Sequence, residues 1–84
     1  MPKINLQNII IEKFKDKNLN TYYLIVNNDN KKEAFFCFDR TVKEGWDELV
    51  KNYENITGAE IEFEPSNNGN KRVINLYAIK YANV

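Results

Sequence analysis

Residues 34–64, AFFCFDRTVKEGWDELVKNYENITGAEIEFE, place one amphipathic segment between two segments rich in aromatic and β-branched residues. The apolar residues of the middle segment recur at intervals of four, three, one and three, which is the spacing of one helix face: Val42, Trp46, Leu49, Val50 and Tyr53. Thr41 and Glu44 lie three residues apart at its start, in the arrangement of a capping box that satisfies amide groups of a first helical turn. The sequence therefore predicts a helix that begins near Thr41.

Polar clusters divide the rest of the chain into strand-like segments. The clusters are rich in Asn, Asp and Gly, which favour turns, and the segments between them are rich in Ile, Val, Tyr and Phe, which favour strands. The predicted strands are Asn5–Lys15, Thr21–Val26, Glu33–Phe38, Ala59–Glu64 and Arg72–Lys80. The first is long and is expected to bend near Asn8, so that it can pair with two partners. We therefore expect a mainly β fold, a small five-stranded barrel in the order β-β-β-α-β-β with one helix between strands three and four.

Length and composition indicate one small globular domain. The chain has 84 residues, of which 43% are hydrophobic and 29% charged, so we expect a single domain over residues 1–84. No apolar run approaches the roughly 18 residues that a membrane helix needs, and the start MPKINLQN lacks the apolar stretch of a signal peptide. These features predict a cytoplasmic protein with no membrane association.

The inventory of reactive side chains argues against catalysis. The chain has no histidine, one cysteine, Cys37, and one serine, Ser66. Without histidine no triad can activate the serine, and a lone cysteine forms neither an internal disulfide nor a cysteine-based metal site. We expect a binding protein without enzymatic activity, bound metal or cofactor, in which Cys37 is a packed strand residue.

The order of the elements, with a single helix between the third and fourth strands, resembles the oligonucleotide/oligosaccharide-binding (OB) fold. Residues 34–64 and the last strand KRVINLYAIK carry the resemblance, which covers nearly the whole chain. In particular, the chain resembles single-stranded DNA-binding domains of the replication protein A type and small phage-encoded relatives. This resemblance implies a ligand groove across the second and third strands, flanked by the first-to-second and fourth-to-fifth loops. Trp46 is then expected to close one end of the barrel.

Side-chain alternation in the two middle strands predicts which residues face a ligand. The even-numbered residues of the two strands are apolar and are expected in the core: Leu24, Val26, Ala34, Phe36 and Phe38. Tyr23 and Phe35 would then point outward on neighbouring strands. Exposed aromatic rings stack on bases, at about 1–3 kcal/mol per base. The alternatives are a protein contact and ordinary burial, and a one-residue slip in register would exchange the two faces.

Charges separate by sign along the chain, although the net charge is zero. Cations occur in and beside loops that would rim the groove: Lys13, Lys15, Lys17, Lys71 and Arg72. Acids occur on the predicted helix and as a row on the solvent face of the fourth strand: Glu60, Glu62 and Glu64. Such a separation can attract phosphates, although lysines are common in the loops of any soluble protein.

The sequence therefore predicts a non-catalytic domain that binds single-stranded DNA or RNA. Tyr23 and Phe35 would stack on bases, and the five loop cations would contact phosphates. The alternative is a protein–protein interaction module, such as a small inhibitor, adaptor or accessory subunit, which the zero net charge and the glutamate row favour. No feature of the sequence sets an oligomeric state.

Overall fold

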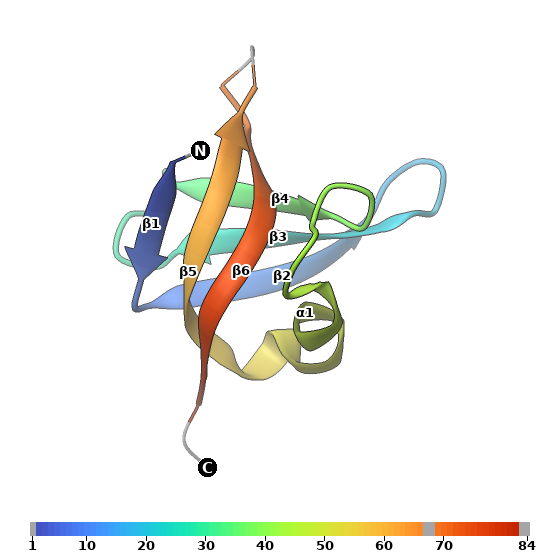
Figure 1. Cartoon of the computed structure of the whole chain (residues 1–84). Helices are drawn as coiled ribbons and strands as arrows, with labels where there is room; N and C mark the ends of the chain where they lie inside the picture. The colour runs from blue at the N-terminus through green and yellow to red at the C-terminus, as the bar shows by residue number, and fades with distance from the viewer. Residues whose placement is uncertain (1, 67–68, 83–84) are drawn as a thin grey trace.

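The structure, a computed structural model, describes residues 2–66 and 69–82. Within these residues the chain is mainly β, as predicted, with six strands and one short helical segment (Figure 1). The elements are β1 (Lys3–Leu6), β2 (Ile9–Lys15), β3 (Thr21–Asn27), β4 (Ala34–Phe38), α1 (Trp46–Asn52), a 3-10 turn (Tyr53–Asn55), β5 (Ile56–Pro65) and β6 (Lys71–Tyr81).

The strands form one sheet in the order β1-β5-β6-β4-β3-β2. Figure 1 shows β5 and β6 crossing in front of β2, β3 and β4, so the sheet folds into two layers. The described sheet differs in detail from the expected five-stranded barrel, because it has six strands and is not closed. Gln7 and Asn8 interrupt the predicted first strand, whose halves pair with different partners: β1 with β5, and β2 with β3. The helix therefore follows the fourth strand of the chain and not the third.

The helix α1 begins at Trp46, later than predicted. Gly45 precedes it with φ 90°, and no side chain caps the first turn. The predicted capping box does not form because β6 holds the backbone of Glu44. The Glu44 amide donates to Asn75 Oδ1 at 3.1 Å, and its carbonyl accepts from the Leu76 amide at 2.9 Å. No helix formed by the described residues has the length and apolar composition needed to cross a membrane.

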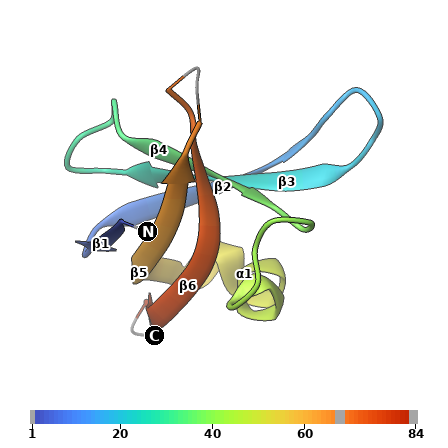
Figure 2. The same ribbon diagram turned by 45° about the horizontal axis from the view of Figure 1, so that its top comes forward.

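The core lies between the two layers of the sheet and α1. It is formed by residues from every strand, from α1 and from the segment before α1: Leu6, Ile9, Ile11, Tyr23, Ile25, Phe35, Cys37, Val42, Leu49, Ile56, Ala59, Ile61, Val73 and Leu76. In β3 and β4 these are the odd-numbered residues, so the even-numbered set predicted for the core faces outward instead. Trp46 is half-buried and packs against the core from α1, at one end of the strands (Figures 1 and 2).

Candidate functional site

Tyr23 and Phe35, the residues predicted to stack on bases, lie in the core. Their side chains are 2% and 0% exposed. The Tyr23 ring packs on Trp46 and Tyr53, with centroids 5.5 and 5.3 Å away, and the Phe35 ring packs on Phe63 at 5.1 Å. The prediction that Tyr23 and Phe35 face outward is wrong. Both faces of β3 and β4 are apolar, so alternation did not distinguish them, and the face that the helical segment and β5 cover became the core.

The even-numbered residues of β2, β3 and β4 carry a cluster of aromatic rings on the opposite, outward face. The strand register places Phe14 opposite Tyr22, and Tyr22 opposite Phe38, so three rings form a row across three strands. Neighbouring centroids in this row are 5.6 and 5.5 Å apart. Phe36 lies next to the row, with its ring 6.1 Å from that of Phe38 and inclined to it by 6°. We call these four rings the outer aromatic face.

The outer aromatic face is accessible to a ligand. Phe14 is 37% exposed, and Tyr22, Phe36 and Phe38 are half-buried. None of the four belongs to the core cluster or to the residues that pack against it. The rings therefore contact one another while part of their surface stays open to solvent.

Two hollows lie beside the outer aromatic face and share Phe38 and Arg40. The first has a volume of about 440 Å³ and lies between the β2–β3 loop and the segment after β4, lined by Asp16, Asn20, Thr21, Phe38, Asp39 and Arg40. The second, of about 250 Å³, is lined by Phe38, Arg40, Thr41, Ser66, Asn70 and Arg72. Figure 2 shows the β2–β3 loop and the adjoining ends of β5 and β6 projecting from the same side of the molecule. The two hollows therefore lie next to each other, between the β2–β3 loop and the adjoining ends of β5 and β6.

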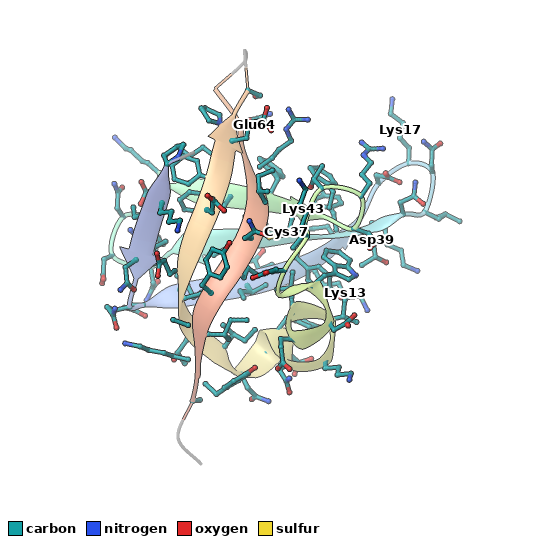
Figure 3. All side chains as sticks on the ribbon, in the orientation of Figure 1. Lys13, Lys17, Cys37, Asp39, Lys43 and Glu64 are labelled. Atoms are coloured by element: carbon teal, nitrogen blue, oxygen red, sulfur yellow. The ribbon has the colours of Figure 1, made fainter. Side chains whose placement is uncertain are left out.

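The lysines predicted near the first loop lie away from the outer aromatic face. Lys13 is opposite Tyr23 in the register and so shares the odd-numbered face of β2, as Lys15 does. Figure 3 shows Lys17 at the far end of the β2–β3 hairpin. Lys17 is exposed in the loop that contributes Asp16 and Asn20 to the first hollow, but it does not line that hollow itself.

The two cations predicted at the last loop differ in their surroundings. Lys71 Nζ lies 3.4 Å from Glu33 Oε2 and 5.3 Å from the centroid of the Phe35 ring, so a carboxylate compensates its charge. Arg72 is the register partner of Phe36 across the parallel β4–β6 pairing, and it lines the second hollow. The structure thus brings Arg72, and not Lys71, to the edge of the outer aromatic face.

Arg40 is a candidate site residue that the sequence pattern did not indicate. Its guanidinium carbon lies 5.7 Å from the centroid of the Phe38 ring, and it lines both hollows. The signal that could have identified it is its position two residues after the last aromatic residue of a strand. A cation at that point can reach back over the end of the strand.

The glutamate row belongs to a different face, on β5. Glu62 accepts hydrogen bonds from Asn75 Nδ2 at 2.6 Å and from the Tyr77 hydroxyl at 3.4 Å. The Asn75 hydrogen bond, with smaller contributions from the charge of Lys3 and from Tyr77, holds the pKa of Glu62 below its usual value. Alternation along β5 predicts the three residues between the glutamates, Ala59, Ile61 and Phe63, for the core. Ala59 and Ile61 are buried, and Phe63 is half-buried and packs against the core. Glu60 and Glu62 therefore lie between β1 and β6, whereas Glu64 is the register partner of Arg72, at the edge of the outer aromatic face.

Two further observations bear on the chemistry of the chain. Cys37 is fully buried, and burial raises the pKa of its thiol far above the usual value. Among the described residues, no three histidine, cysteine or acidic side chains lie close enough to hold a metal ion.

In comparisons with known proteins, no family model, no curated protein and no solved structure matches the chain.

Proposed function

We propose that the chain is a binding domain without a catalytic centre that holds single-stranded DNA or RNA on the outer aromatic face. The row Phe14, Tyr22 and Phe38 carries the proposal, because three partly exposed rings cross three adjacent strands and pack on one another instead of on the core. Every base has a π face, so such a row can stack bases without sequence preference, at about 1–3 kcal/mol per base. This surface takes the place of the one predicted around Tyr23 and Phe35.

The strand arrangement supports an OB-like barrel as part of the proposal. β1 and β2 lie at the two ends of the sheet and are joined directly by Gln7 and Asn8, so they can be regarded as halves of one bent strand. Counted in this way, the chain has five strands, with the helix between the third and the fourth. The hollows beside Phe38 then lie between the two loops where an OB-type groove is expected.

Arg40 and Arg72 supply the positive charge in this proposal. Each phosphate neutralised on a single strand contributes a slope of about −0.7 to the dependence of log affinity on log salt. Two arginines therefore give a slope of about −1.4, and affinity should fall about sevenfold for a fourfold rise in salt. This modest salt dependence agrees with a chain of zero net charge.

A polarisation titration with fluorescent dT and U oligonucleotides of about 12 nucleotides tests the proposal. We expect the Tyr22→Ala/Phe38→Ala variant to bind at least about 30-fold more weakly, because two stacked bases lose about 1 kcal/mol or more each. Tyr81→Ala is the matched control, since it removes an exposed ring at the other end of β6, next to α1. Absence of binding by the natural chain, or unchanged affinity in the folded double variant, contradicts the proposal.

A protein contact is the second candidate, and one observation favours it. Ile10 is 46% exposed and continues the outward face of β2 to β4 with Val26 and Ala34, its neighbours in the register. This aliphatic row has no charge and can bury apolar area against another protein. Size-exclusion chromatography with light scattering would reveal self-association. Co-purification from cell extract with and without nuclease would separate a protein partner from a nucleic acid.

A further inference from the structure

The two hollows differ in charge. The first contains two carboxylates, Asp16 and Asp39, beside Arg40. Among the described residues that line the second, none is acidic and two are arginines, Arg40 and Arg72. An anionic group is therefore repelled from one hollow and attracted to the other.

The two arginines have donors that the rest of the described chain leaves unused. Of the residues described, only Lys71 and Glu33 form an ion pair. Glu64 is the register partner of Arg72 on β5, yet no ion pair joins them. The Nε atom of Arg72 is buried and has no hydrogen-bond partner among the described residues. A buried charged donor without a partner destabilises the folded chain.

The walls of the second hollow are tied to the sheet. Thr41 Oγ1 donates to the Phe38 carbonyl at 3.1 Å, which holds the segment after β4 against the end of that strand. The amide of Ser66 donates to the Asn70 carbonyl at 2.7 Å, which joins the two sides of the β5–β6 loop. Arg72 is fixed in β6 by its pairing with β4. The two guanidinium groups therefore extend from positions that the backbone defines.

The hollow also lies where the row of rings ends. The row runs from Phe14 on β2 through Tyr22 on β3 to Phe38 on β4, and the next strand in the sheet is β6, which carries Arg72. A strand whose bases follow the row would reach, at Phe38, the hollow that this ring lines together with Arg40 and Arg72. The β5–β6 loop bounds the hollow on the far side, through Ser66 and Asn70.

We propose that the second hollow is a subsite for a phosphomonoester, in which Arg40 and Arg72 hold the terminal phosphate of the strand that the outer aromatic face binds. This inference rests on the proposed function. A terminal phosphate carries about −1.5 to −2 charges and three acceptor oxygens at neutral pH, whereas an internal diester carries a single charge. Two guanidinium forks without a carboxylate partner match the terminal group better in both charge and number of donors.

Competition titrations with dT oligonucleotides bearing a 5′-phosphate, a 3′-phosphate or no phosphate test the inference. We expect one of the two phosphorylated forms to bind about tenfold more tightly than the unphosphorylated form, because charge-assisted hydrogen bonds are added at one end of the row only. Equal affinity of all three forms overturns the subsite. Equal tightening by both phosphates also overturns it, because that result indicates attraction by overall charge.

Arginine variants assign the effect to the hollow. Arg40→Met and Arg72→Met should each reduce the tenfold preference for the phosphorylated strand to less than about twofold. Arg40 is exposed, so its variant keeps the test valid if the Arg72 variant fails to fold. Lys71→Met is the matched control, since it removes a neighbouring charge that already pairs with Glu33, and it should retain the preference. Retention of the preference in both arginine variants overturns the assignment.

A titration with inorganic phosphate, followed by amide chemical shifts, separates this inference from the proposed function. Shifts confined to the lining of the second hollow support the anion subsite even if no oligonucleotide binds. Oligonucleotide binding without any effect of the end phosphate leaves the proposed function standing and overturns the subsite. Absence of both kinds of binding overturns both.

Discussion

Tyr22 and Tyr23 are consecutive residues of β3, and their rings lie on opposite faces of the sheet in different chemical surroundings. Tyr23 is enclosed in the core and packs edge-on against Trp46, with an angle of 74° between the rings. Tyr22 lies outside and stacks on Phe14, with an angle of 25°. One strand therefore carries a structural aromatic residue and a candidate binding residue side by side.

The division between inner and outer faces predicts unequal costs for two neighbouring substitutions in β4. Phe35→Ala should lower the free energy of unfolding by about 3–5 kcal/mol, because it leaves a cavity in a fully buried position. Phe36→Ala should cost less than about 2 kcal/mol, since that ring is only half-buried. Urea unfolding followed by Trp46 fluorescence measures both values. Equal losses would show that the two faces have been assigned incorrectly.

Gly45 is expected to be the more sensitive of two glycines with positive φ. A Cβ atom at Gly45 would lie 2.6 Å from Leu76 Cβ, whereas a Cβ atom at Gly69 would meet nothing within 4 Å. Gly69→Ala should therefore cost only the backbone strain of about 1–2 kcal/mol. Gly45→Ala should cost about 2–4 kcal/mol, because steric overlap adds to that strain. Thermal melts of the two variants provide the comparison, and similar melting temperatures would contradict the close packing of Gly45 on β6.

Stability in acid should depend on Glu62. The hydrogen bond from Asn75 is the main cause that lowers its folded-state pKa below the ordinary value of 4.5. The ionised group therefore stabilises the fold above about pH 4.5, and this contribution is lost as the pH falls through the lowered pKa. Glu62→Gln should reduce the drop in melting temperature between about pH 6 and pH 3. Glu64→Gln, a change at an exposed position of the same strand, should keep the natural pH dependence; the same result for both variants would contradict the role of Glu62.

The thiol of Cys37 should be unreactive in the folded chain. Burial raises its pKa far above the usual value, and the thiolate is the form that reacts. A disulfide reagent such as Ellman's should therefore modify Cys37 at neutral pH only as fast as the chain unfolds, and it should react at once in denaturant. Rapid modification without denaturant would show that the inner face of β4 is open to solvent.

The strands were predictable because turn clusters and β-forming residues alternate clearly along the chain. The sequence did not predict which face of β3 and β4 is buried, because apolar residues occupy both the odd-numbered and the even-numbered positions of each strand. The residue that resolves the ambiguity is Trp46, which packs on Tyr23 from a helix more than twenty positions away. The helix start was also missed, because the contact between Glu44 and β6 is a long-range interaction that a local capping pattern does not contain.

A binding site between two loops stays a prediction, and most of the residues predicted for it lie elsewhere in the structure. The resemblance to the OB fold implied a groove between two loops, and the two hollows lie between those loops. Of the seven residues predicted for it, Arg72 lines a hollow and Lys17 lies in a bordering loop, while Tyr23 and Phe35 are in the core. Arg40 could be identified as a candidate site residue only from the fold, which places the end of β4 next to β6.

A two-dimensional NMR titration of the isotope-labelled chain with an unlabelled dT oligonucleotide tests the location of the binding surface most directly. We expect the largest amide shifts along the outward face of β2, β3 and β4, at Phe14, Tyr22, Phe36 and Phe38, and in the lining of the hollows. Glu60 and Glu62 on β5 should show little change. Shifts concentrated on β5 and β1, or no shifts at an oligonucleotide excess, would contradict binding of a single strand by the outer aromatic face.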